Sequence, residues 1–558
     1  MQEIAKDTIG SWQQEGRQTI PQNFEEFRNL VVKARDLVER GKYHMAAVYC
    51  EMAANYASCQ GCGLWVSSDI EQILFKIGQK AIPARAKLEQ SRAVATSKPK
   101  KILHVATAMA SIGGHSRMLW RWLQQDPDRC HSLVLTRQFP KPIPQALSQA
   151  IKDRHGKIYQ LNRNPGNIID WAKQLREIAA DADLVVLHVN GADVIPTIAF
   201  ANKEFSPPIC FLDHADHLFW LGASISDVVI SLRESGMKLA QSRRTIESNR
   251  NFLLPIVLEP IQRNLPRDVA KQQLGISKDS VLLLSIARAV KYKKMDGISF
   301  ADAHISLLKQ YEQAILIVVG PGDREDWASA IEQTQGRLKV LCETEHTAVF
   351  YQAADIYVDS FPFVSNTSLL EAGSYGTPLV SRYPYPSESS AILGADMPGL
   401  TGNLLRVNTL EEYTKILSKL IEDSEFRQSL GVATSGKIAD THWGDGWQQS
   451  LEKFYSYAST IPKINIPMNF ADKMLLEDLD CLISRVHSMD ISDDKLMQWH
   501  LPLMPFPDRL YHWLVIFKKR GLRNNPINLL MSEWTRSPYY AAQASLKSFL
   551  DSRKSKSA

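Results

Sequence analysis

Residues 365–368, Ser-Asn-Thr-Ser, place small polar side chains at the expected start of a helix. The free N–H groups of Thr367, Ser368 and Leu369 would point out of this turn with the helix dipole behind them. Such a turn suits a diphosphate. Glu371, one turn further, is placed to accept hydrogen bonds from a polyol such as a ribose. The alternative is an ordinary capped crossover helix with Glu371 on its solvated face.

A basic stretch follows a β-type run at residues 281–286. Arg288 comes directly after this run, and Lys291, Lys293 and Lys294 come a turn later. Arg offers a planar fork and Lys a point charge, so together they could neutralise the charge that grows on a departing diphosphate. A solvated basic loop is the alternative, above all for Lys291 and Lys294.

Another polar turn, Gly113-Gly114-His115, follows the β-type run at residues 102–106. The two glycines let a ligand approach the backbone closely, and His115 opens the next helix. A βα turn that needs glycine for steric reasons alone gives the same pattern.

Residues 213–217, Asp-His-Ala-Asp-His, bring two carboxylates and two imidazoles together after the run at 209–212. A carboxylate that orients a histidine makes a general base for an acceptor hydroxyl, and Asp213 and His214 are the candidates. Metal ligation would need ligands that converge from elsewhere; none is identifiable, so no metal site is predicted. The third interpretation is a loop whose polar groups satisfy one another.

Two further candidates follow the next β-type runs. Gly320, in Gly-Pro-Gly-Asp, ends the run at 315–319 in a turn that a ligand could contact. Glu343 follows the run at 338–341. It could recognise a nucleotide base or a sugar there, or cap a helix that begins near Thr347.

Helical stretches alternate with these runs, which are mostly continuously apolar, as strands buried on both faces of a parallel sheet are. Two successive β/α series predict an α/β fold with two doubly wound, Rossmann-like domains that face a cleft. Ligands bind at the carboxyl ends of strands in such sheets, so the candidates should line that cleft. The predicted strands are 102–106, 132–135, 184–189, 209–212, 228–231, 281–286, 315–319, 338–341, 356–358 and 379–380.

Bulk composition excludes several classes. Of the 558 residues 44% are apolar and 22% charged, which is typical of a globular protein. A formal charge of +5 is too small for nucleic acid as the main partner. Seven scattered cysteines, a CxxC at Cys59 and Cys62 without a second pair, and no apolar leader or 20-residue apolar window predict a reduced, cytoplasmic protein.

The ordered features resemble a GT-B glycosyltransferase, family-4-like (glycosyl transferases group 1), with O-GlcNAc-transferase-like features in the donor segment. The resemblance covers about residues 100–460. It rests on Gly113-Gly114-His115, on Arg288 with Lys293, on Gly320-Pro321-Gly322, and on AADIYVDSFPFVSNTSLLEAGSYGTPLVS.

The resemblance implies a nucleoside-diphosphate sugar as co-substrate, no cofactor, and a polysaccharide, lipid or protein acceptor. It assigns Arg288 and Lys293 to the diphosphate and Glu371 to the ribose. Asn366, Thr367 and Ser368 would form the phosphate turn, and His115, Asp213 and His214 would face the transferred sugar or the acceptor. The implied domains are an N-terminal helical domain (1–97), an acceptor-side Rossmann-like domain (98–260), a nucleotide-sugar-binding Rossmann-like domain (261–440), a returning helix (441–460) and a helical C-terminal extension (461–558).

One position departs from the family. Retaining family-4 enzymes typically carry two glutamates separated by seven residues, and the first would fall at position 363, which is Phe363 here. The outcome therefore stays open between an inverting route with a histidine base and a retaining route in which the leaving phosphate takes the proton. The loss also motivates a second hypothesis, a non-catalytic nucleotide-sugar-binding or scaffold protein on this fold.

The N-terminal helical domain is predicted from helices at 24–40, 43–57 and 67–77, the last ended by Gly78. In the C-terminal extension, the apolar stretch 513–517 leads into Lys518-Lys519-Arg520. It is either a helix packed on the body of the protein or an element at the inner face of an anionic membrane.

Overall fold

The computed structural model describes residues 7–82, 99–138, 142–202, 206–260, 263–383, 385, 394, 396–464, 468–487, 489, 491–524 and 526–536. These residues fall into two compact units, each built on one sheet. The first-sheet unit takes the described parts of 15–231, 239–252 and 453–558. The second-sheet unit takes those of 7–14, 232–238 and 253–452.

The first sheet has the strand order β3-β2-β1-β4-β5-β6-β7, and the pairs from β3 to β6 are parallel. Its order reverses at β1, as in a doubly wound sheet. All five predicted strands are confirmed; β3 and β7, of three residues each, were not predicted because they are too short to give an apolar run. The strands are β1 (Lys101–Ala106), β2 (Cys130–Leu135), β3 (Ile158–Gln160), β4 (Leu184–His188), β5 (Ile209–Asp213), β6 (Val228–Ser231) and β7 (Asn251–Leu253).

Helices connect these strands, and local sequence sets where they begin. Asn167 caps one of them, since its side chain accepts from the N–H of Ile169 and Asp170 accepts in return from the N–H of Asn167. The helices are α4 (Gly114–Gln125), α5 (Gln145–Asp153), α6 (Ile168–Ala179), α7 (Val194–Ala199) and α8 (Glu234–Arg244).

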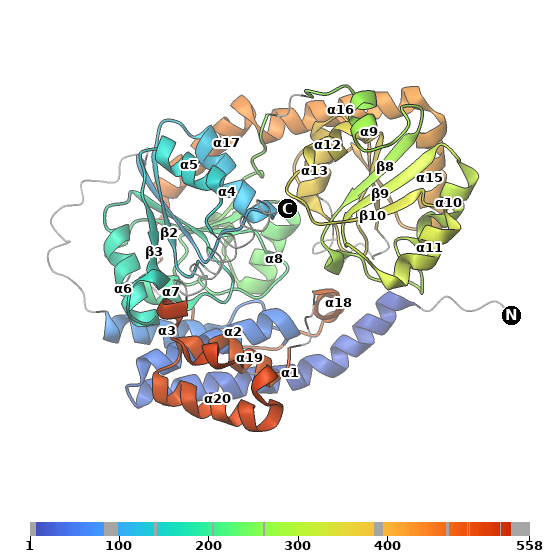
Figure 1. Cartoon of the computed structure of the whole chain (residues 1–558). Coiled ribbons are helices and arrows are strands. Elements are labelled where there is room, and N and C mark those ends of the chain that lie inside the picture. Colours follow the sequence, from blue (N-terminus) through green and yellow to red (C-terminus); the bar gives the residue numbers. More distant parts are fainter. Residues whose placement is uncertain are drawn as a thin grey trace, which may run out of the picture. The chain divides into compact units, whose positions relative to one another are not determined.

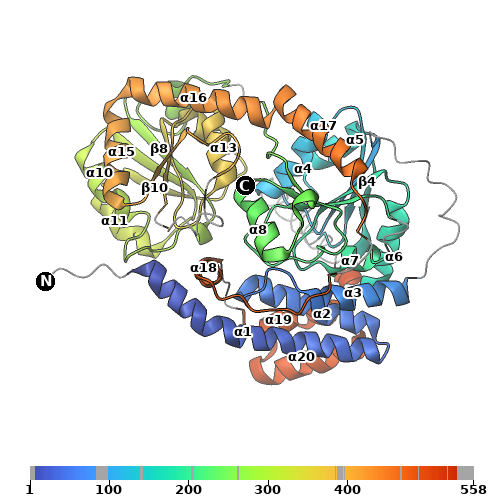
Figure 2. The same ribbon diagram turned by 180° about the vertical axis from the view of Figure 1, so that it is seen from behind.

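Helices from both ends of the chain complete the first-sheet unit. One hydrophobic core joins residues of α1–α3, the first sheet, α19 and α20, and Figures 1 and 2 both show α19 and α20 beside α1 and α2. They are α1 (Thr8–Glu39), α2 (Tyr43–Gln60), α3 (Ser68–Ala81), α18 (Asp478–His487), α19 (Asp493–His500) and α20 (Phe506–Arg520).

The prediction that Gly78 ends its helix is wrong. The helix α3 continues to Ala81, and the Gly78 carbonyl accepts from the N–H of Ile82. A Cβ at Gly78 would lie 2.4 Å from the Ile198 carbonyl oxygen, so this glycine serves close packing against α7 rather than helix termination.

The second sheet has the order β10-β9-β8-β11-β12-β13, all parallel. Figure 1 shows α9, α12 and α13 on one face and α10, α11 and α15 on the other. The strands are β8 (Val281–Ile286), β9 (Ala314–Gly320), β10 (Leu338–Cys342), β11 (Ile356–Val358), β12 (Leu379–Arg382) and β13 (Leu404–Val407). The helices are α9 (Arg267–Gln273), α10 (Ile305–Gln310), α11 (Ala328–Gln333), α12 (Ala348–Ala353), α13 (Asn366–Ser374), α15 (Leu410–Glu422) and α16 (Ser424–His442).

The predicted helix at 441–460 is α17 (Gly444–Thr460), and the division between the units falls inside it. Trp447 donates to the Pro255 carbonyl oxygen at 3.0 Å in the second-sheet unit. Further along, Tyr455 packs in the first-sheet unit, where its ring lies 6.4 Å from that of Trp122. None of the described helices combines the length and apolar character needed to cross a membrane.

The CxxC cysteines, Cys59 and Cys62, are both buried free thiols. Burial raises the pKa of Cys59 to about 11 and that of Cys62 to about 12, so both are protonated at neutral pH. They behave as small core residues.

Candidate functional site

The carboxyl ends of β10, β9, β8 and β11 are neighbours along one edge of the second sheet. We call the loops that follow these four strands the second-sheet edge. The corresponding loops after β1, β4 and β5 form the first-sheet edge. Each candidate from the sequence falls on one of these two edges or on the helix that follows it.

The helix α13 supplies backbone donors at the second-sheet edge. It begins at Asn366, within the predicted turn 365–368, because Leu369 donates its N–H to the Ser365 carbonyl at 2.9 Å. The prediction of a free Leu369 N–H is therefore wrong. The N–H groups of Asn366, Thr367 and Ser368 donate to no group among the described residues.

The loop before α13 is held by Asp359, which is fully buried after β11. Its Oδ1 accepts from the backbone N–H groups of Ser360 and Ser365, both at 2.9 Å, and its Oδ2 accepts from the Ser381 hydroxyl at 3.3 Å. Burial raises the pKa of Asp359, and these hydrogen bonds and the Lys291 ammonium oppose the rise. The carboxylate thus fixes the position at which the helix starts.

Lys291 is a residue whose role the sequence did not reveal. The ammonium is not on a solvated loop: it donates to the Val364 carbonyl oxygen at 2.8 Å and lies 4.7 Å from the centre of the Phe363 ring. Burial lowers its pKa to about 8, against the attraction of Asp359. Phe363, where a retaining enzyme would carry glutamate, here packs under this cation.

The other cations of this loop differ in exposure. Arg288 is exposed at the start of a 3₁₀ turn, Ala289–Lys291, and its side chain bonds to no described residue. Lys293 is half-buried and Lys294 exposed. The guanidinium is therefore available to an anion, while Lys291 is engaged with the loop that precedes α13.

The alternative interpretation, in which Glu371 lies on the solvated face of its helix, is wrong. This side chain is buried, and its Oε2 accepts from the Tyr351 hydroxyl at 3.2 Å. Glu343 is exposed after β10 and no hydrogen bond to it is seen among the described residues. The structure places Glu371 on α13, which follows β11, and Glu343 after β10, at the far end of the same edge.

Gly320 is required by the close approach of two strand ends. Its φ is +122°, and a Cβ there would lie 2.1 Å from the Ala287 carbonyl oxygen. Since β8 and β9 are paired up to this point, only glycine lets the two strand ends stay together.

The first-sheet edge brings two candidate histidines into contact. The rings of His115 and His214 stack with centres 3.8 Å apart and an angle of 3°. Burial, with the neighbouring imidazoles, lowers the pKa of His115 well below its usual range, and burial lowers that of His214 to about 4. Both are neutral at pH 7 and can accept a proton.

The group that holds His214 is a backbone carbonyl. Its Nδ1 lies 3.3 Å from the Leu212 oxygen, so Nδ1 carries the proton and Nε2 the lone pair. Asp213, predicted to orient it, is buried with Oδ2 3.8 Å from Nη1 of Arg244. Gly113 and Gly114 precede His115, and a Cβ at Gly113 would meet nothing within 4 Å.

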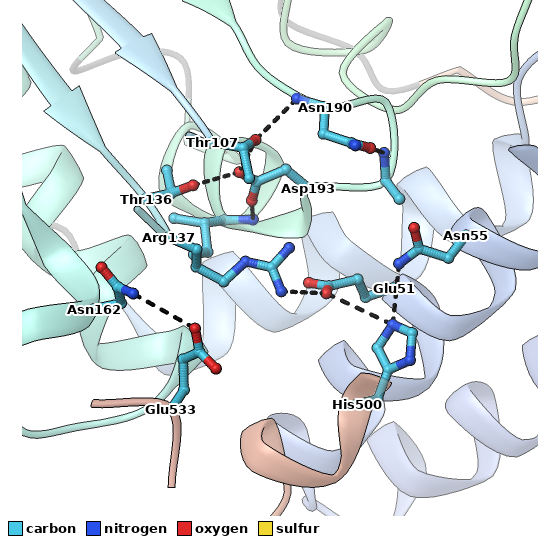
Figure 3. A network of polar contacts seen from close by, with 12 residues as sticks. Glu51, Asn55, Thr107, Thr136, Arg137, Asn162, Asn190, Asp193, His500 and Glu533 are labelled. Atoms are coloured by element: carbon cyan, nitrogen blue, oxygen red, sulfur yellow. Dashed lines mark hydrogen bonds and ion pairs between the residues drawn. The ribbon is translucent and has the colours of Figure 1, made fainter. Parts of the chain in front are cut away.

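A buried polar network ties the helical parts to the first-sheet edge (Figure 3). Asp193 accepts from the hydroxyls of Thr107 at 2.7 Å and Thr136 at 2.5 Å, just after β1 and β2. Next to them Arg137 donates to Glu51 of α2 at 2.5 Å, and His500 of α19 lies 3.7 Å from the same carboxylate. Burial raises the pKa of Glu51 to about 7, although Arg137 opposes it.

The sequence of residues 266–435 matches the model of the family "Glycosyl transferases group 1". This span runs from α9 into α16 and contains every candidate of the second-sheet edge. Residues 266–435 are a glycosyltransferase group 1 domain.

The chain is 25% identical over 189 residues to D-inositol 3-phosphate glycosyltransferase of Thermobifida fusca. That match covers 31% of this chain and 42% of the relative, so the chain spans less than half of the length of this relative. A glycosyltransferase structure from Rickettsia africae aligns over 65% of this chain and 99% of its own, with 11% identity and a TM-score of 0.50. The O-GlcNAc transferase of Thermobaculum terrenum aligns over 81% and 84%, with 14% identity and a TM-score of 0.45. The fold is GT-B, with two parallel doubly wound domains.

Proposed function

We propose that this chain transfers a sugar from a nucleoside-diphosphate sugar to an acceptor hydroxyl or amide, without a metal ion. The observation that carries the proposal is the set of three N–H groups at Asn366, Thr367 and Ser368, within the group 1 domain, that donate to none of the residues that the structure describes. A helix N-terminus of this kind binds phosphate, and the name of the Thermobifida relative is that of a sugar transferase.

In this reaction, negative charge would develop on the diphosphate of the donor as it leaves the sugar. When the bond between the anomeric carbon and the diphosphate oxygen breaks, its electron pair stays on the diphosphate. The α13 N–H groups, Arg288 and Lys293 would stabilise that negative charge, which is the part a divalent cation plays elsewhere. Glu371 would accept hydrogen bonds from the ribose hydroxyls. The acceptor proton would pass to His214 or His115 in an inverting reaction, or to the leaving phosphate in a retaining one.

The test starts with the donor. A thermal-shift panel of nucleoside diphosphates and their sugars should give a hit with UDP, GDP or ADP compounds, and the hit then serves as donor in hydrolysis and transfer assays with EDTA present. Arg288→Ala should lower kcat about 100-fold or more, because it removes charge from the leaving group. Lys294→Ala, an exposed cation of the same loop, is the matched control and should stay within about twofold of the wild type.

Two results would contradict the proposal. If Arg288→Ala and Glu371→Ala both leave hydrolysis and transfer unchanged, the donor-site assignment is wrong. Tight nucleotide binding without turnover on any acceptor extract would favour the non-catalytic binding protein that Phe363 suggests.

We also propose that α20 makes peripheral contact with an anionic membrane. Phe506, Tyr511 and Leu514 of this helix are exposed, and the basic run 518–520 ends it. Sedimentation with vesicles containing anionic lipid should carry down the wild type and far less of a Tyr511→Ser, Leu514→Ser variant. Equal sedimentation of the two proteins, or no sedimentation of either, would contradict the proposed contact of α20 with the membrane.

A further inference from the structure

Three histidines occupy the interior of the first sheet, where apolar residues are expected. His131, His104 and His188 lie on β2, β1 and β4, which are neighbouring strands, and none has exposed surface. Burying an imidazole without a hydrogen bond is costly, so such a row is retained only when its members bond to one another.

These histidines form a continuous hydrogen-bonded chain. Nδ1 of His131 lies 2.9 Å from Nε2 of His104, and Nδ1 of His104 lies 2.9 Å from Nε2 of His188. At one end, Nε2 of His131 lies 3.1 Å from Oδ2 of Asp126, within ion-pair distance but without the alignment of a hydrogen bond. The chain therefore spans three strands and ends on a carboxylate.

The carboxylate end is held as an anion. Oδ1 of Asp126 accepts from Arg129 at 2.8 Å, and Oδ2 accepts from the Tyr455 hydroxyl at 2.7 Å. Burial alone would raise the pKa of Asp126, but the close contact with His131, the hydrogen bond from Tyr455 and the charge of Arg129 lower it below its usual range.

An anion at one end gives the chain a direction. A carboxylate only accepts, so His131 presents N–H at Nε2 and a lone pair at Nδ1. That lone pair requires N–H at Nε2 of His104, and the same argument gives His188 an N–H at Nε2. Every ring is then neutral, and the last lone pair stands on Nδ1 of His188.

The opposite end reaches the first-sheet edge. Nδ1 of His188 and Nε2 of His115 are both buried and have no hydrogen-bond partner among the described residues, and the two ring centres lie 6.1 Å apart. His115 in turn stacks on His214. Two unpartnered nitrogens on adjacent rings mark the place where a proton can enter the chain.

We propose that His188, His104 and His131 form a proton relay that takes a proton from the His115–His214 pair and holds it on His131, beside the Asp126 carboxylate. Nδ1 of His188 gains the proton, Nε2 of His188 gives its own to Nδ1 of His104, and Nε2 of His104 gives its own to Nδ1 of His131. Each ring ends neutral except His131, which becomes an imidazolium beside the Asp126 carboxylate. Each transfer breaks one N–H bond and forms another, so the chain holds one extra proton. Reversal of the three transfers after the product has left returns that proton to the partly exposed His115–His214 pair, from which it passes to water.

The use of the relay in sugar transfer rests on the proposed function: the proton is the one that the acceptor hydroxyl loses when its oxygen bonds to the anomeric carbon. His115 and His214, both neutral, meet the acceptor, and the relay keeps them neutral by removing the proton. The charged and titratable groups around the relay are Asp126, Arg129, Tyr455, His115 and His214.

The first experiment reads the relay without any substrate. Nitrogen-15 NMR of the imidazoles in the full chain should show His104 and His188 protonated at Nε2, with a lone pair at Nδ1, at pH 7.5. Protonation of His104 or His188 at Nδ1 at this pH overturns the direction and with it the relay.

The second experiment distinguishes proton transfer through His104 from a purely structural role of its side chain in the core. His104→Gln keeps an acceptor and a donor in the middle of the chain but cannot pass a proton on, whereas His104→Phe removes both. We expect His104→Gln to leave donor binding unchanged, to lower kcat at least tenfold, and to shift its pH profile. Transfer by His104→Gln at the wild-type rate with an unchanged pH profile overturns the relay's part in catalysis. Absence of transfer in the wild type counts against the proposed function instead, and leaves the NMR result to decide the relay.

Discussion

The two sheet edges are built by opposite means. At the second-sheet edge, cations and backbone N–H groups are presented by a loop that Asp359 and Lys291 hold in place. At the first-sheet edge the polar groups are stacked, neutral imidazoles, continued into the sheet by further histidines. The candidate groups of the second-sheet edge are cations and N–H donors, whereas the candidate bases of the first-sheet edge are neutral imidazoles.

This difference matches the two halves of the proposed transfer reaction. A leaving diphosphate develops negative charge, which fixed donors and cations stabilise. An acceptor hydroxyl has to lose a proton, which a neutral base accepts. The comparison teaches that a doubly wound sheet can be specialised at its carboxyl edge without a change of strand order. The order β3-β2-β1-β4-β5-β6 of the first sheet corresponds to β10-β9-β8-β11-β12-β13 of the second.

The largest expected difference between the two units is in their stability at low pH: a fall in pH should destabilise the first-sheet unit more than the second-sheet unit. Among the described residues, lowered pKa values fall on seven histidines of the first-sheet unit and two of the second: His44, His104, His115, His188, His214, His500 and His512, against His304 and His442. The unfolded state, with histidine pKa values near 6.5, binds more protons, so stability is lost as pH falls below 6.5. For His188, whose pKa burial lowers to about 3, the loss at pH 5 is about 2 kcal/mol.

Hydrogen exchange measured by mass spectrometry at pH 5 and pH 7.5 checks this prediction. After correction for the intrinsic rate, peptides from β1, β2 and β4 should lose protection at pH 5 to a greater extent than peptides from β8, β9 and β11. At the second-sheet edge the raised pKa of Asp359 works in the opposite direction, because a buried carboxyl gains from protonation. Equal loss in both units would show that the histidines do not set the acid response.

The sequence predicted most of the fold because apolar runs alternate with helical stretches and do not depend on distant contacts. It also brought His115 and His214 to one edge, since both follow strands whose carboxyl ends lie on the same side of the sheet. The role of Lys291 could not be predicted, because its partners are a backbone carbonyl and a ring 72 to 73 residues away.

The histidine chain escaped prediction for a different reason. A single histidine does not interrupt the apolar character of β1, β2 or β4, so each run still predicts a buried strand. The contacts arise only from strand order and register, which bring His104 between His131 and His188. Neither strand order nor register can be derived from the sequence pattern, so three histidines on separate strands did not indicate that their rings are in contact.

A pair of glycines offers the smaller and sharper comparison of the two edges. Gly113 and Gly320 have nearly the same φ, +126° and +122°, so alanine strains the backbone alike at both. The sites differ in space: a Cβ meets nothing within 4 Å at Gly113 but would lie 2.1 Å from the Ala287 oxygen at Gly320. Gly113→Ala should therefore cost about 1–2 kcal/mol of unfolding free energy from strain alone, and Gly320→Ala about 3 kcal/mol or more from strain and overlap.

Urea unfolding of the two variants, followed by far-UV circular dichroism, gives the two losses directly. The excess for Gly320→Ala measures how strongly the second-sheet edge depends on the contact between the ends of β8 and β9. Should the two variants lose equal stability, that strand end must move aside at little cost. The loop with Arg288, which follows the Ala287 carbonyl, would then be an adaptable part of the edge rather than a fixed one.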